Sequence, residues 1–193
     1  MICGYIVTPQ DGRAYYFSDA VLASLSCPLC RSVLDDAYIP SALRPARRLD
    51  AWSSFDHRDV FSRSIVEWLR STGVIDVDFE PVGDGEKWWR IKARRIVEID
   101  HGKSRVETGP VCDACGKYTW VTIQGPWTLK DICAPLSPGL YQTNTLFGSH
   151  WEKQPALIFA TETKKLADAR RFRGLGFRTL YSADHVFKTD RKF

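Results

Sequence analysis

The sequence lacks most of the features that mark an enzyme. Its histidines show no metal-ligand spacing and number only four: His57, His101, His150 and His185. It contains no Walker loop, dinucleotide fingerprint or nucleophile elbow, and its lone Gly-Leu-Gly at 174–176 is typical of a helix end. The acidic pattern at 76–80 has neither the glycine turn nor the distant Glu of a calcium loop. We therefore predict that the chain has no catalytic site.

Long hydrophobic runs are also missing. No window approaches the ~20 apolar residues that a membrane-spanning helix needs, and the opening MICGYIVTPQDGR lacks the charged start and apolar core of a secretory signal. These absences predict a cytoplasmic protein that makes no membrane contact. With 193 residues, 44% of them hydrophobic, the chain can bury a real core without crosslinks.

Six cysteines are present, and a disulfide framework does not explain them, because the cytoplasm keeps thiols reduced. Four of them form two Cys-x-x-Cys pairs, CPLC at 27–30 and CDAC at 112–115, with 81 residues between the pairs. Four thiolates make the tetrahedral ligand set of structural Zn²⁺, which leaves no coordination position open for catalysis. We predict one structural zinc ion held by Cys27, Cys30, Cys112 and Cys115, with Cys3 and Cys133 as buried thiols outside the site.

Two other interpretations of the cysteines stay open at this point. CPLC could be a redox dithiol, which normally lies at the start of a helix, and CPLCRSVLDDAY could begin one. The cysteines could also be small buried hydrophobic residues, although paired spacing would then have arisen twice by coincidence.

The hydrophobic pattern predicts an α+β fold with mixed sheets, a zinc-ribbon-like double knuckle and two similar strand-helix-strand pieces. The expected elements are an opening strand pair (3–7 and 14–17, with a turn at Asp11-Gly12), a helix within 60–72 capped by Asp56 or Asp59, strands within 74–82 and 87–99, and a late strand (156–160), helix and strand (177–181). We expect a single compact unit over 1–193. Its sub-parts would be 1–125, which contains an inserted piece at 31–111, and 126–193.

The order of these motifs resembles the double-CxxCG motif family of bacterial immunity proteins. CPLC, a middle section, CDACG, GLYQTNTLFGS and the late LIFATETKKLADARRFRGLGFRTL carry the resemblance, which covers nearly the whole chain. Gly116 keeps the glycine of the motif, whereas Arg31 stands in the equivalent place after the first pair. Glycine tolerates a positive φ there, whereas an arginine at position 31 does so less readily.

The resemblance implies a cytoplasmic antidote that binds and neutralises a cognate toxin domain delivered by a competing bacterium. Its partner would be that toxin domain, which it would block by occlusion, while zinc keeps the binding surface rigid. An alternative from a different class is a zinc-ribbon protein that binds nucleic acid.

Charge patterning suggests a surface for each of these functions. Residues 1–86 carry eight Lys/Arg and 13 Asp/Glu, a net charge of −5, whereas residues 87–193 carry 19 and 10, a net charge of +9. An acidic row in the first half would complement a basic toxin cleft, or would simply protect an edge strand from aggregation: Asp76, Asp78, Glu80, Asp84 and Glu86. A basic row with an aromatic neighbour would suit nucleic acid, or would simply be the solvated face of a sheet: Trp88, Arg90, Lys92 and Arg94.

Overall fold

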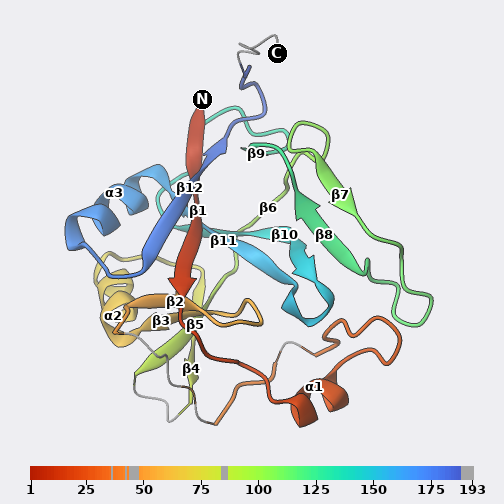
Figure 1. The fold of residues 1–193 in the computed structure, drawn as a ribbon. Coiled ribbons are helices and arrows are strands. Elements are labelled where there is room, and N and C mark those ends of the chain that lie inside the picture. The colour runs from red at the N-terminus through yellow and green to blue at the C-terminus, as the bar shows by residue number, and fades with distance from the viewer. Residues whose placement is uncertain (36, 42, 44–47, 84–86, 188–193) are drawn as a thin grey trace.

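A computed structural model describes residues 1–35, 37–41, 43, 48–83 and 87–187. These residues form an α+β fold that is mostly sheet, with three α-helices (Figure 1). The elements in chain order are β1 (Ile2–Asp11), α1 (Asp19–Leu25), β2 (Ala51–Ser53), β3 (Asp59–Ser62), α2 (Arg63–Ser71), β4 (Val77–Val82), β5 (Trp88–Ala93), β6 (Ile96–Val97), β7 (Val106–Thr108), β8 (Trp120–Ile123), β9 (Trp127–Thr128), β10 (Leu140–Ser149), the 3₁₀ turn η1 (His150–Glu152), β11 (Gln154–Ala160), α3 (Thr161–Arg170) and β12 (Leu175–Tyr181). Asp84 and Glu86 of the predicted acidic row lie outside the described residues.

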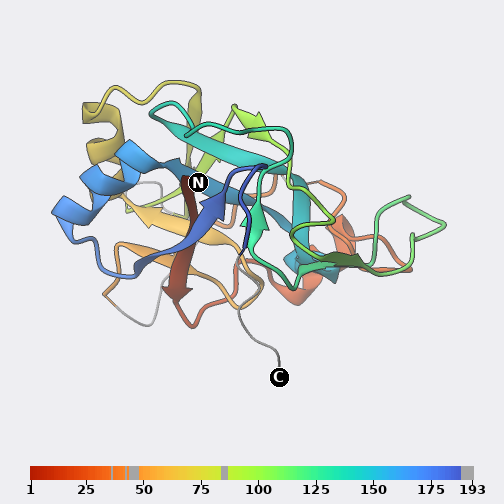
Figure 2. The same ribbon diagram turned by 90° about the horizontal axis from the view of Figure 1, so that it is seen from above.

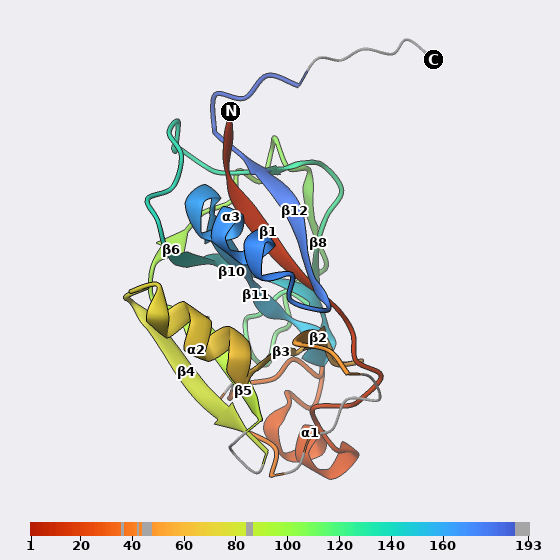
Figure 3. The ribbon, with the colours of Figure 1, turned by 90° about the vertical axis from the view of Figure 1, so that its left-hand side faces the viewer.

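Two strand-helix-strand pieces share one plan. In β3–α2–β4, the two strands both pair antiparallel with β5, which lies between them. In β11–α3–β12, the two strands likewise flank β1. Figure 3 shows α2 and α3 on the same side of the strands. The similarity between the two sequence segments therefore corresponds to a repeated arrangement in space.

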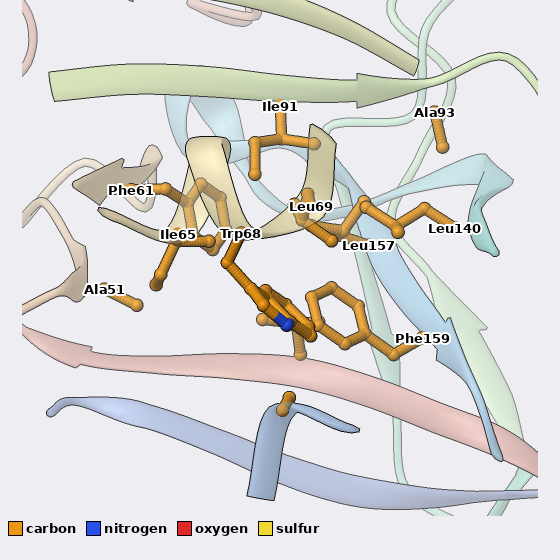
Figure 4. Close-up of a cluster of buried hydrophobic side chains, with 12 residues drawn as sticks. Ala51, Phe61, Ile65, Trp68, Leu69, Ile91, Ala93, Leu140, Leu157 and Phe159 are labelled. Atoms are coloured by element: carbon orange, nitrogen blue, oxygen red, sulfur yellow. The ribbon is translucent and has the colours of Figure 1, made fainter. Parts of the chain in front are cut away.

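The two pieces share a hydrophobic core. The helix α2 buries an apolar stripe at Ile65, Trp68 and Leu69, because residues three and four positions apart fall on one helix face. Figure 4 shows Trp68 beside Phe159 of β11, with 6.3 Å between the ring centroids. The same cluster contains Ala167 of α3. Burial of these side chains, at about 1.5–3 kcal/mol each, ties the two pieces together.

The predicted N-terminal strand pair is wrong. β1 is a single ten-residue strand that pairs with β11, β12 and β2, and residues 14–17 form no strand. The backbone N–H groups of Tyr16 and Phe17 instead donate to the carboxylate of Asp56, at 2.8–3.1 Å. Because a side chain satisfies these donors, the segment needs no partner strand, and it leads directly into α1.

The predicted cap of the second helix is also wrong. Ser62, not Asp56 or Asp59, is the N-cap residue of α2. Asp59 lies in β3, and the carboxylate of Asp56 accepts hydrogen bonds from the N-terminal segment. The helix ends at the C-cap residue Thr72, and Gly73 follows it with a φ of 72°.

None of the helices in the described part of the chain has the length and apolar character needed to cross a bilayer.

Seen from above, α2 and α3 lie at one side of the molecule, and the loop between β7 and β8 projects at the other (Figure 2). That projecting loop carries the second cysteine pair.

Candidate metal centre

The two cysteine pairs occupy turns with the same backbone hydrogen bonds. In the first turn, the N–H of Arg31 donates to the carbonyl of Cys27 at 2.8 Å, and the N–H of Cys27 donates to the carbonyl of Ser32 at 2.9 Å. In the second turn, Gly116 and Lys117 take the corresponding places, with the same distances from Cys112. A β-bridge closes each turn at matching positions, 26 with 33 and 111 with 118. The chain therefore contains two equivalent knuckles.

Arg31 adopts the backbone conformation that glycine adopts in the second knuckle. Its φ is 57°, and the φ of Gly116 is 68°. An L-residue in this left-handed region costs roughly 1–2 kcal/mol. The departure from the CxxCG pattern thus leaves the turn intact but strained.

The two knuckles bring the four sulfur atoms together. The Sγ atoms of Cys27 and Cys112 lie 3.7 Å apart, and those of Cys30 and Cys115 lie 3.5 Å apart. All four lie within 4.8 Å of one another. A disulfide would need about 2.05 Å, whereas a tetrahedron of about 2.3 Å metal–sulfur bonds has edges of about 3.8 Å. The cluster is therefore able to hold a metal ion, as the spacing of the cysteines predicted.

Electrostatics within the cluster favour a bound cation. Backbone N–H groups of Cys30 and Leu29 lower the pKa of the Cys27 thiol. Burial would raise the pKa of Cys30, but hydrogen bonds from the hydroxyl and N–H of Ser32 hold it at about 6. For Cys115 the N–H of Lys117 lowers the pKa, while burial and the three other thiols outweigh it and raise the pKa to about 11. Four thiolates repel one another, so all four ionise together only when a cation neutralises them.

Side chains that the sequence gave no reason to single out surround the cluster. The buried ammonium of Lys153 donates to Ser32 Oγ at 2.7 Å and to the carbonyl of Tyr118, so it joins the first knuckle to the second. Lys117 donates from the second knuckle to the carbonyl of Val33 at 2.8 Å. With a divalent ion bound to four thiolates, these two ammonium groups would bring the local charge close to zero. Lys117 follows the second cysteine pair closely in the sequence, whereas only the fold brings Lys153 to the cluster.

The redox interpretation does not fit the first knuckle. The helix α1 ends at Leu25, before Cys27, and the described residues between Cys30 and β2 contain no helix. The cysteines therefore lack the helix N-terminus that would stabilise a redox thiolate.

Of the two cysteines outside the cluster, Cys3 is buried, but Cys133 is exposed, so the prediction of a buried thiol is wrong for Cys133.

The predicted acidic and basic rows lie on neighbouring strands and bind each other. β4 and β5 pair antiparallel with Glu80 opposite Arg90. Glu80 forms ion pairs with Arg90 at 2.6 Å and with Lys92 at 3.2 Å. Further along, Arg94 binds Asp78 and Arg95 binds Asp76. The carboxylates and cations thus form one ion-pair ladder, which we define as Asp76, Asp78, Glu80, Arg90, Lys92, Arg94 and Arg95.

The aromatic member of the basic row faces the protein interior. Trp88 lies edge-on against the buried Trp52, with 5.7 Å between ring centroids. It belongs to the cluster around Trp52, Tyr16 and Phe17. That packing half-buries the ring against this cluster, so the ring is not an open platform for a nucleotide base.

Comparisons of the chain with models of protein families, with curated proteins and with solved structures give no match. The resemblance to the double-CxxCG motif family, and the function it implies, therefore stay predictions.

Replacing Arg31 with Gly should stabilise the protein, because glycine removes the strain of the positive φ. We expect a gain of about 0.5–1 kcal/mol, the relief being partly offset by the greater freedom of glycine in the unfolded chain. Gly116→Ala is the matched control. Nothing lies within 4 Å of its added Cβ, so only backbone strain acts, and we expect a loss of about 1 kcal/mol. Urea unfolding of both variants measures the two changes in stability; changes of the same sign would contradict the equivalence of the knuckles.

Proposed function

We propose that this protein is a cytoplasmic immunity protein that neutralises a cognate toxin domain by binding it, and that Zn²⁺ in the four-cysteine centre has a structural role. The observation that carries the proposal is the pair of equivalent knuckles, which matches the double-CxxCG layout of the chain. Cysteines 85 positions apart lie at sulfur–sulfur distances that suit one tetrahedral ion.

The choice of zinc follows from the ligands. Thiolates are soft donors, and a four-sulfur tetrahedral set is typical of zinc or of iron–sulfur sites. The cysteines leave no open coordination position, so the ion would stabilise the fold and not activate water. Its position between two knuckles supports a role in fixing the surface around them.

Binding by occlusion accords with the absence of catalytic motifs in the sequence. A protein that blocks a partner needs a rigid, complementary surface, because ordering flexible groups on binding costs affinity. The knuckles, joined by Lys153 and Lys117, provide such rigidity at one end of the molecule. The carboxylates of the ion-pair ladder, by contrast, already form ion pairs with the cations of the ladder. The role of these carboxylates in partner binding stays a prediction.

Co-expression tests this function directly. The gene next to this one would be expressed in a bacterial host, alone and together with this chain. We expect growth arrest from the neighbouring gene product alone, rescue by this protein, and co-purification of the two at a fixed ratio. A neighbouring product that is harmless, or toxicity that this protein does not relieve, would contradict the proposal.

Nucleic-acid binding should be weak and non-specific. Arg90, Lys92 and Arg94 are engaged by carboxylates of the ladder, so a phosphate backbone would have to displace them. With fluorescein-labelled 20-mer DNA and RNA at 150 mM salt, we expect dissociation constants weaker than about 10 µM, and little change when the three cations become Ala. Sub-micromolar binding that these substitutions abolish would favour the nucleic-acid alternative.

A further inference from the structure

A hollow with aromatic walls lies beside α1. It has a volume of about 880 Å³, and its walls include Tyr15, Tyr38, Leu22 and the side chain of Trp151. A second hollow of about 400 Å³ shares Asp19, Leu22 and Trp151 with it and extends to the first knuckle. We call these two neighbouring hollows, which share three lining residues, the α1 groove.

The base of the groove is rigid and aromatic. Phe17 and Tyr38 stack with 5.6 Å between centroids and 26° between planes, and Tyr16 meets Tyr38 edge-on. Both Tyr16 and Phe17 are nearly fully buried, and their N–H groups are held by Asp56. These rings therefore keep their positions when a partner binds, at little cost in conformational entropy.

The rim of the groove exposes aromatic surface. The side chain of Tyr15 is 69% exposed and packs against Phe55, which is 44% exposed. A hydrogen bond of 2.8 Å from the N–H of Phe55 to the carbonyl of Ala14 joins the two segments. Large aromatic rings that are both exposed and fixed are typical of the residues that dominate protein interfaces.

The charge of the larger hollow is one-sided. Among the described residues that line it, Asp19 alone has a charged side chain, and it is exposed at the start of α1. Aromatic faces attract cations through their quadrupoles, and a nearby carboxylate adds a direct ion pair. The combination suits a guanidinium or ammonium group on an apolar stem.

We propose that this groove is the docking site for a partner protein, and that it receives an arginine or lysine side chain from that partner between the aromatic rings, with Asp19 as its counter-ion. The inference rests on the proposed function, since the partner would be the toxin domain. It assigns the anchor of the complex to the α1 groove and not to the ion-pair ladder.

The groove is coupled to the metal centre through its Trp151 wall. Arg58 donates to the carbonyl of Trp151 at 3.1 Å, and a ring nitrogen of the neighbouring His150 lies 2.9 Å from the carbonyl of Cys30. Cys27, Pro28 and Arg31 of the first knuckle form the far end of the groove. An ion that fixes the knuckles therefore fixes the binding surface as well.

Peptide selection tests the docking site without knowledge of the partner. A phage library of random 12-residue peptides would be panned on the full-length protein, and the selected peptides would be synthesised for titration. We expect selected sequences to carry Arg or Lys beside apolar residues, and their affinity to fall at least tenfold for Asp19→Asn and for Tyr15→Ala. Both side chains are exposed, so these variants should fold normally.

Glu107→Gln is the matched control, because it also removes one exposed carboxylate and lies on β7. Its affinity for the selected peptides should equal that of the unmodified protein. Failure to select peptides, selection of peptides without a cation, or equal affinity for Asp19→Asn would each overturn the assignment.

The toxin assay separates this inference from the proposed function. If the unmodified protein relieves toxicity and the Tyr15→Ala and Asp19→Asn variants relieve it equally, the docking site is wrong while the function stands. If peptides bind as expected but no toxicity is relieved, the function is wrong while the docking site stands. Loss of protection by both variants, with Glu107→Gln still protective, supports the two together.

Discussion

Replacing Cys115 with Ser should abolish metal binding and lower the melting temperature by at least about 10 °C. Serine is a poor ligand in a thiolate site, and three sulfurs hold the ion far less tightly than four. Structural zinc contributes on the order of 10 kcal/mol to folding in small zinc modules, and about 4 kcal/mol corresponds to roughly 10 °C for a chain of this size. Zinc content and thermal unfolding, measured on the same preparation, give both readouts.

Cys133→Ser is the control for this prediction, because it makes the same chemical change at an exposed cysteine outside the cluster. It should keep full metal content and an unchanged melting temperature. If Cys115→Ser and Cys133→Ser melt alike, the centre does not stabilise the fold.

Replacing Asp56 with Ala should cost about 3 kcal/mol. The carboxylate is 1% exposed and accepts the backbone N–H groups of Tyr16 and Phe17. Its loss would leave two buried donors without an acceptor, at about 1–3 kcal/mol each. Because these residues form the base of the α1 groove, the same change should also weaken binding of the selected peptides. Urea unfolding and peptide titration measure the two effects.

Asp35→Ala provides the comparison. Asp35 also accepts a backbone N–H, from Ala37 at 2.8 Å, but the bond is exposed, so water replaces it when it is lost. We expect less than about 1 kcal/mol from this change. An Asp56→Ala variant as stable as Asp35→Ala would show that the buried carboxylate does not organise the N-terminal segment.

The helices with strong periodic patterns could be predicted from the sequence. Ile65, Trp68 and Leu69 share a face at helical spacing, and α2 covers that region. The cysteine cluster could also be predicted, because a Cys-x-x-Cys spacing has few uses in a chain without a disulfide framework. Both cases depend on local patterns that tertiary structure does not override.

The N-terminal segment could not be predicted in the same way. Residues 14–17 have the composition of a strand, but a carboxylate about forty positions away satisfies their N–H groups. A seven-residue helix then follows with no fully buried side chain, so it leaves only a weak hydrophobic pattern. The prediction that Asp56 caps α2 was wrong for a related reason, because its carboxylate accepts the N–H groups of Tyr16 and Phe17.

The ion-pair ladder shows that a period-two pattern predicts which residues share a face of a strand, but not which strand lies next to it. Alternation places Asp78 and Glu80 on one face of their strand, and Arg90 and Lys92 on one face of theirs. Nothing in either segment says that the strands are neighbours in a register that puts Glu80 opposite Arg90. The acidic and basic rows, which were predicted to bind two different partners, therefore form one surface whose charges neutralise each other.

Zinc stoichiometry tests the central claim most directly. Native mass spectrometry of the full-length protein, purified without added metal or chelator, measures the mass of the ion held by each chain. We predict one Zn²⁺ per chain, lost in Cys115→Ser and retained in Cys133→Ser. A chain that carries no metal, yet unfolds at the same temperature before and after treatment with a strong zinc chelator, would contradict it.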